Sequence, residues 1–229
     1  VYVEHNTPRQ SPTGSEHPLG GQSRIPIVHV THFNAVMWAN GRAPAHVVEH
    51  GIPDPGYRYT GMLPRVGYVV NEPVRRGRVT GSDLVGHIAR IAPVDAFGMD
   101  TAPLTTGAHR HEVIGHGDIA HDAMHTMLAD RRVYAHLCRW TSLGLSLLEA
   151  MFLGMPVVAL SVTEAPEALN GSAAVVSNDL LRLQEHVRDV IHDPELAADL
   201  GRRNRAHVET RYSLQRFHAD WDRLLKEVL

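Results

Sequence analysis

Hydrophobic and polar positions follow two different periods along this chain, and their order predicts an α/β protein. Short apolar runs bounded by turn residues predict buried strands at residues 1–6, 25–30, 65–72, 93–99, 131–137, 155–162 and 172–177, and in a run that begins at 45. Apolar residues every three or four positions predict helices at 31–41, 81–92, 118–129, 142–154, 178–192, 194–210 and 213–228. Such alternation forms βαβ units around a mostly parallel sheet, which binds ligands beyond the carboxyl ends of its strands.

Turn residues divide this pattern into two units. Pro53, Pro55 and Gly56 indicate a boundary between a first unit, residues 1–52, and a second unit that begins at 53. Residues 7–24 are rich in Pro, Gly and Ser, which is typical of a long mobile loop. The chain begins without a methionine and directly inside a strand-like run. We therefore expect that an upstream part of the first unit is missing.

The most apolar segment, residues 139–160, has Glu149 at its centre. A membrane span needs about 20 apolar residues, but this segment also holds two glycines and Pro156. It divides into a short buried helix ended by Gly154 and a buried strand, so we reject a membrane span. A carboxylate buried in such a helix costs several kcal/mol unless it finds hydrogen-bond donors, and a ligand hydroxyl could supply them. The alternative is that Glu149 lies on the exposed side of an amphipathic helix.

Composition narrows the choice of partners. The formal net charge is −3, which argues against a dedicated nucleic-acid-binding protein. The only cysteine is Cys138, so no intrachain disulfide can form, and the absence of a charged-then-apolar leader gives no sign of secretion. We expect a cytoplasmic protein without a transmembrane segment.

Three arginines follow the first strand of the second unit. Arg75, Arg76 and Arg78 surround a glycine, and a helix is expected to begin near residues 80–82. Backbone N–H groups at a helix N-terminus together with arginine side chains suit a diphosphate. The alternative is a solvated basic loop, because most runs of charge lie on the surface.

The histidines offer a rival chemistry. The chain has 17, and five of them lie between residues 109 and 125. His111 and His116 are five residues apart and cannot share a helix face, whereas His121 and His125 have the spacing of metal ligands. Asp118 or Asp122 could join them, but no third ligand is fixed by the spacing. The alternatives are a zinc site and a histidine-rich surface loop and helix on the far side of a βα unit.

The segment "TSLGLSLLEAMFLGMPVVAL" resembles the donor-binding motif of retaining GT-B glycosyltransferases of the family 4 type (glycosyl transferases group 1). That motif has the form "EGFGLVLLEAMACGTPVVA". Gly144 and Leu145 match its Gly-Leu pair, and Glu149 matches its second glutamate, which binds the ribose of the nucleotide in that family. The following "VTEAPEAL" is similar to the next family segment, with Glu167 at the glutamate.

The resemblance extends to other parts of the chain. "VVEHGIPD" is similar to the family's entry into the second domain, and Arg75 falls on an arginine that holds the diphosphate. His5, at the end of "VYVEHN", resembles a histidine that contacts the donor sugar. Residues 213–229 are similar to a closing helix that crosses back to the first domain, which makes residues 53–212 the nucleotide-sugar-binding domain. Three features differ from the family pattern, namely Thr141 in place of the first glutamate, Thr80 in place of a lysine, and the missing first half of the N-terminal domain.

The resemblance implies two Rossmann-like parallel-sheet domains of GT-B type, one complete and one partial. It implies transfer of a sugar from a nucleotide diphosphate sugar, the co-substrate, to an acceptor that the sequence does not identify, with retention of configuration and without a metal or other cofactor. It names no catalytic base. Two alternatives remain, a noncatalytic nucleotide-binding module and a metal-dependent hydrolase built on the histidines. The predicted donor site comprises Arg75, Arg76, Arg78, Thr141, Ser142, Leu143, Gly144, Leu145 and Glu149, with His5 as a candidate sugar contact.

Overall fold

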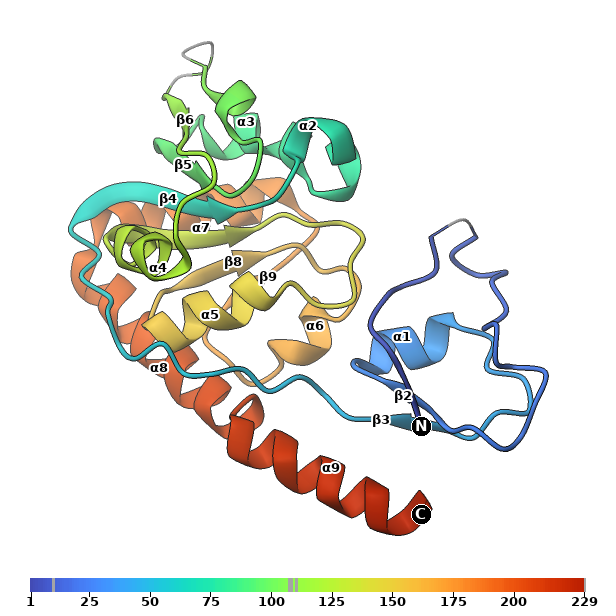
Figure 1. Cartoon of the computed structure of the whole chain (residues 1–229). Helices are drawn as coiled ribbons and strands as arrows, with labels where there is room; N and C mark the ends of the chain where they lie inside the picture. The colour runs from blue at the N-terminus through green and yellow to red at the C-terminus, as the bar shows by residue number, and fades with distance from the viewer. Residues whose placement is uncertain (10, 107–108, 110, 229) are drawn as a thin grey trace.

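Two separate parallel sheets make up the framework of the protein (Figure 1). The computed structural model describes residues 1–9, 11–106, 109 and 111–228. The smaller sheet has the order β1-β2-β3 and consists of β1 (Tyr2–Glu4), β2 (Ile27–His29) and β3 (Ala45–Val47). The larger sheet consists of β4 (Leu63–Val69), β5 (Val94–Phe97), β6 (Val113–Gly115), β7 (Arg131–His136), β8 (Val157–Ala159) and β9 (Val175–Val176). All neighbouring strands in both sheets are parallel, so the predicted α/β class with parallel sheets is confirmed.

The larger sheet reverses direction at its centre. Its order is β6-β5-β4-β7-β8-β9, so the chain moves outward from β4 to β6, returns to the other side of β4, and continues outward from β7. This is the strand order of a dinucleotide-binding Rossmann domain. The connections leaving β4 and β7 diverge to opposite sides, which opens a crevice beyond the carboxyl ends of these two strands.

Nine α-helices connect and cover the strands in the part of the chain that the structure describes. The four shortest are α1 (His32–Met37), α2 (Pro73–Arg76), α3 (Val85–Ile88) and α6 (Ala165–Ala168). The longer ones are α4 (His121–Ala129), α5 (Leu145–Leu153), α7 (Leu180–His192), α8 (Pro194–Arg211) and α9 (Leu214–Val228). Helices α4 and α5 lie on one face of the larger sheet and α7 on the other (Figure 1). Within the described residues, no helix is both long and apolar enough to cross a membrane.

Helix α5 is the most deeply buried helix of the core. Leu147, Leu148, Met151 and Phe152 are each at most 1% exposed, as the all-round apolar sequence predicts. The helix ends at Gly154, which has a left-handed backbone (φ +91°) that favours glycine. The prediction of a buried helix ended by Gly154 and followed by a strand is confirmed.

Three local predictions differ from the structure. Helix α1 ends at Met37 instead of Gly41, because Trp38 is already extended and its indole donates a hydrogen bond to the Asn6 carbonyl. The helix expected over 81–92 is only a 3-10 turn (Ser82–Leu84) followed by α3, and this segment contains two glycines, which are poor helix formers. Strand β6 was not predicted, since its three residues lie between histidines and glycines.

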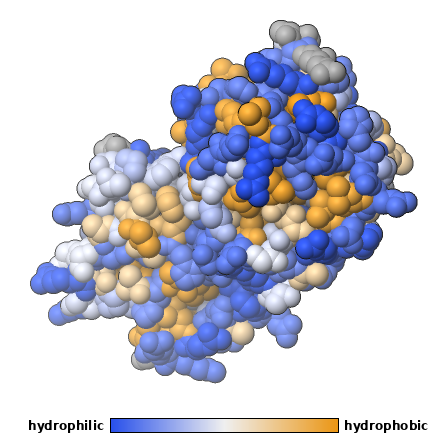
Figure 2. Space-filling view, turned by 180° about the vertical axis from the view of Figure 1, so that it is seen from behind, coloured by the Kyte–Doolittle hydropathy of each residue, from blue (hydrophilic) through white to orange (hydrophobic). Residues whose placement is uncertain are grey.

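The C-terminal helix joins the two sheets. Helix α9 runs from the larger sheet to the smaller one, beside which both chain ends lie (Figure 1). Leu224 of α9 packs against Val28 and Val48 in a second, small hydrophobic cluster. Viewed from behind, hydrophobic residues reach the surface only in separate patches among hydrophilic ones (Figure 2). The domain boundaries at 52 and 212 stay a prediction, and Leu229 lies outside the described residues.

Candidate functional site

A pocket of about 550 Å³ opens at the point where the larger sheet reverses. Its walls come from segments that follow strands, as expected for a parallel sheet. The residues after β4 and β7 form its floor, and the loop before α5 together with α4 and α5 forms one side. The lining includes Tyr68, Asn71, Arg76, Thr80, Gly98, Asp118, His121, His136, Thr141, Gly144, Leu145 and Glu149.

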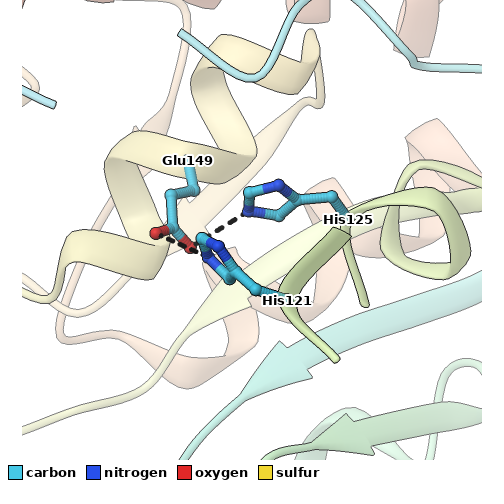
Figure 3. Close-up of side chains that lie close together, drawn as sticks. All are labelled: His121, His125 and Glu149. Carbon is cyan, nitrogen blue, oxygen red and sulfur yellow. Dashed lines mark hydrogen bonds and ion pairs between the residues drawn. The ribbon is translucent and has the colours of Figure 1, made fainter. Parts of the chain in front are cut away.

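Glu149 lies in the wall of this pocket, and two histidines of α4 reach it across the gap between α4 and α5 (Figure 3). His121 Nε2 is 3.1 Å from Oε1 of Glu149, and His125 Nε2 is 3.4 Å from Oε2. Burial raises the pKa of Glu149, but the close approach of His125 and then of His121 outweighs it, so the pKa lies below its ordinary value. The carboxylate is therefore held ionised at neutral pH.

The histidine-rich helix lies at the pocket. Its expected position on the far side of a βα unit is wrong, because α4 follows β6 and packs beside α5. The expected partners of the two histidines are also corrected, since Asp122 pairs with Arg58 (2.7 Å) and Glu149 takes the third position. Glu149 is 28 residues from His121, so no local spacing could reveal this contact. The four-residue spacing of the histidines was the only signal in the sequence.

Of the three predicted arginines, Arg76 is the one that lines the pocket. The Arg75 guanidinium turns back to Glu72, with Nε 2.6 Å from Oε1, and Arg78 lies 3.1 Å from Asp83. Arg76 makes no ion pair with any residue that the structure describes. Its charge therefore remains available to an anion in the pocket.

Residues 141–145, the predicted donor-binding loop, lie partly in the pocket lining and partly in the protein interior. Thr141, Gly144 and Leu145 line the pocket, whereas Ser142 and Leu143 are buried behind it. The Ser142 hydroxyl lies 3.4 Å from that of Thr31, at the junction with the first unit. Gly144 is also the residue before α5, whose first backbone N–H groups begin at the pocket.

Gly144 leaves room for the ring of His136. A Cβ atom at position 144 would lie 2.5 Å from Cε1 of His136, so a larger residue would have to displace this ring. Burial lowers the pKa of His136 to about 4. The pocket floor therefore contains a neutral imidazole at pH 7.

Two residues from the resemblance lie away from the pocket, and one lies in it. His5 is exposed at the end of β1, where its ring stacks on that of His50 at a centroid distance of 6.2 Å. Glu167 is largely exposed and lies 3.5 Å from Arg211. Thr80 does line the pocket, and its hydroxyl donates to the Gly77 carbonyl.

A second buried glutamate, Glu164, was not anticipated. It is 1% exposed and accepts the backbone N–H groups of Phe33 (2.7 Å) and His32 (3.3 Å). It thereby joins the loop after β8 to the start of α1 in the first unit. Glu167, three residues later, is the glutamate that matches the family motif in the sequence.

One family model matches the chain. Residues 107–207 match "Glycosyl transferases group 1", a stretch that contains α4, β7, α5 and the Glu149 wall of the pocket. None of the curated proteins matches the sequence.

Solved structures resemble the whole arrangement. TarM superposes with a TM-score of 0.80 at 15% identity, covering 97% of this chain and 49% of TarM. Anabaena HepE in complex with UDP and glucose gives a TM-score of 0.69 at 17% identity, covering 88% of this chain and 63% of HepE. The fold is of the GT-B type. Sucrose-phosphate synthase from Thermosynechococcus elongatus gives 0.71 at 17% identity, with 89% and 58% covered. The chain thus spans about half to two thirds of the length of these proteins.

Proposed function

We propose that this chain binds the nucleotide diphosphate of a sugar donor in the pocket at the sheet reversal, as part of a glycosyltransferase. The observation that carries the proposal is Glu149, an ionised and largely buried carboxylate that forms the wall of a pocket at the ligand-binding edge of a Rossmann-type sheet. The group 1 match over residues 107–207 and the UDP and glucose in the HepE complex support it.

Each part of the nucleotide has a matching part of the pocket. Carboxylate oxygens accept hydrogen bonds from vicinal hydroxyls, so Glu149 is assigned to the ribose. The diphosphate is assigned to Arg76 and to the first N–H groups of α5 at Gly144 and Leu145, which together supply positive potential. Arg75 and Arg78 are engaged with Glu72 and Asp83 and have no direct role in this assignment.

The same groups would assist the transfer step. Negative charge grows on the diphosphate as the bond to the sugar breaks, and a fixed guanidinium and helix N-terminus stabilise that charge. The proposal includes transfer to an acceptor with retention of configuration and without a metal ion in the reaction. His5 does not line this pocket, so it has no role in nucleotide binding, and a contact with the sugar stays a prediction.

Thr141 favours a second candidate function. It lines the pocket where the family motif carries its first glutamate, so one carboxylate near the sugar is replaced by a hydroxyl. A noncatalytic nucleotide-binding module would need Glu149 and Arg76 but not that carboxylate. The two functions differ in one assay, because only the transferase releases free nucleotide from a nucleotide sugar.

Calorimetric titration of the chelator-treated chain with UDP, GDP and ADP tests the proposal. We expect one nucleotide to bind at micromolar concentration, and Glu149→Gln to weaken it at least about 30-fold, because a charged hydrogen bond to the ribose contributes about 2 kcal/mol. Glu167→Gln is the matched control, since it changes an exposed glutamate outside the pocket and should leave the affinity unchanged. Absence of binding by all three nucleotides, or equal affinities of both variants, would refute the proposal.

A further inference from the structure

The three side chains at the α4–α5 contact have the composition of a transition-metal site. His121 and His125 are four residues apart on one face of α4, and Glu149 comes from α5 (Figure 3). Two imidazoles from one helix turn and a carboxylate from another element make a ligand set that binds Zn²⁺ in proteins. The described residues contain one group of three such side chains with ligand atoms this close, all within 4.8 Å of one another.

The observed distances fit a tetrahedral ion. Ligand atoms in a tetrahedral zinc site with bonds of about 2.0–2.1 Å lie about 3.4 Å apart. The two nitrogen-to-oxygen distances to Glu149 are 3.1 Å from His121 and 3.4 Å from His125. All the ligand atoms of the group lie within 4.8 Å of one another, so an ion between them would have to draw the three side chains slightly together.

The buried histidine of the group has an unsatisfied nitrogen. The His125 side chain is 6% exposed, and its Nε2 makes no hydrogen bond within the described residues, since its approach to Glu149 does not have hydrogen-bond geometry. Buried polar atoms in proteins almost always have a hydrogen-bond partner, and an ion between this nitrogen and the Glu149 carboxylate, 3.4 Å away, would supply one to both. Nε2 is also the atom that points to Glu149.

The surroundings decide which ion fits. Two nitrogen ligands favour Zn²⁺ and similar transition metals over Mg²⁺ and Ca²⁺, which prefer oxygen ligands. With three protein ligands, a tetrahedral ion keeps a fourth position. Glu149 and His121 line the nucleotide pocket, so this position opens into the pocket.

We propose that His121, His125 and Glu149 form a Zn²⁺ site, and that bound Zn²⁺ removes Glu149 from the nucleotide. The proposed Zn²⁺ site rests on the three side chains alone and does not depend on the proposed function. The second half rests on the proposed function, because a carboxylate that coordinates Zn²⁺ does not also accept both ribose hydroxyls. Zinc and nucleotide then bind in competition at one wall of the same pocket.

Titration of the chelator-treated full chain with Zn²⁺, followed by calorimetry, tests the site. We expect saturable binding of one ion per chain, and a visible absorption spectrum of the tetrahedral type when Co²⁺ is used instead. His121→Ala and His125→Ala should each weaken Zn²⁺ binding at least about tenfold, as loss of metal-site groups does. His111→Ala is the matched control from the same histidine-rich stretch, because His111 is not part of the group.

The results of these titrations test the Zn²⁺ site and its competition with the nucleotide separately. His121 is exposed (66% of its side chain), so His121→Ala keeps the test valid even if His125→Ala impairs folding, which circular dichroism checks. Absence of saturable Zn²⁺ binding, or binding that both variants retain, overturns the site. If Zn²⁺ binds and the affinity for the nucleotide stays the same with and without saturating Zn²⁺, the competition is overturned. If no nucleotide binds to the metal-free chain, the proposed function fails while the zinc result still decides the site.

Discussion

Glu149 and Glu164 follow neighbouring strands of the larger sheet, yet their surroundings differ in kind. Glu149 faces a pocket and is approached by the side chains of His121 and His125, one of which is largely exposed. Glu164 is almost completely buried and accepts two backbone N–H groups at the start of α1. Side chains can turn away when a ligand arrives, whereas backbone groups cannot. This difference supports the proposed ligand-binding role of Glu149, whereas Glu164 lies at the junction between the two sheets.

The pKa values of the two carboxyls shift in opposite directions. Burial raises the pKa of Glu164 above its ordinary value, and the N–H groups of Phe33 and His32 only partly offset this. The two histidines lower the pKa of Glu149 despite its burial. Ionisation of Glu149 thus stabilises the folded state above the ordinary glutamate pKa, and this stability is lost as pH falls through its lowered value. The pKa of Glu164 is shifted in the opposite direction, so protonation of Glu164 favours the folded state.

The buried His136 in the pocket floor should give a large pH effect on stability. His136 has a folded pKa of about 4 against 6.5 in the unfolded chain, so its contribution is complete above pH 6.5 and falls as the pH drops to about 4. The loss from this buried ring is about 3 kcal/mol in the free energy of unfolding. Urea unfolding at several pH values should show this slope, and His136→Phe should reduce it. A variant with the same slope as the parent would contradict the burial of a neutral His136, and His218→Phe, on an exposed part of α9, is the control.

Replacing each of the two glutamates with alanine should lower the free energy of unfolding by different amounts. Glu164→Ala leaves two backbone N–H groups without an acceptor, and we expect the free energy of unfolding at pH 7 to fall by about 2 kcal/mol. Glu149→Ala should cost under about 1 kcal/mol, because exposed His121 can turn to water. Urea denaturation measures both. A greater loss from Glu149→Ala than from Glu164→Ala would reverse the assignment.

Arg76 and Arg75 differ in the same way at another part of the pocket, since Arg76 lines it and Arg75 turns back to Glu72. Arg76→Ala should weaken nucleotide binding about tenfold, because it removes a charged donor to the diphosphate. Arg75→Ala is the neighbouring control and should change the affinity less than about twofold, since Arg75 turns back to Glu72 and its exposed charge is screened. Calorimetry with the nucleotide that binds most tightly measures both. Equal losses would restore Arg75, the residue aligned with the family arginine, as the diphosphate contact.

The sequence was sufficient where local patterns decide the structure. The buried helix α5 with its end at Gly154, the strands on both sides of it and the start of α8 at Pro194 follow from apolar periodicity, glycine and proline. The short or interrupted elements were harder. Strand β6 has only three residues, and the helix expected over 81–92 contains glycines, so tertiary contacts rather than periodicity decide both.

The site was predictable in part. Glu149 stood out because a carboxylate in an apolar helix needs a reason, and residues after strands were expected to line the pocket. The contact of Glu149 with His121 and His125 was not predictable, because it depends on how α4 and α5 pack side by side on one face of the larger sheet. In the sequence the histidines and the glutamate indicate two rival chemistries, whereas the structure places them in one cluster. Glu164 gave no local signal, since its partners are backbone groups more than 130 residues away.

We propose that the Glu149 carboxylate is held ready for a nucleotide by the exposed His121 side chain, which can turn away from it. The most direct test is a crystal structure of the metal-free chain with the nucleotide that binds most tightly. We predict that both ribose hydroxyls donate to Glu149, that His121 has turned away from Oε1, and that the diphosphate contacts Arg76. A bound nucleotide that leaves the Glu149–His121 hydrogen bond intact and makes no contact with Glu149 would contradict the claim.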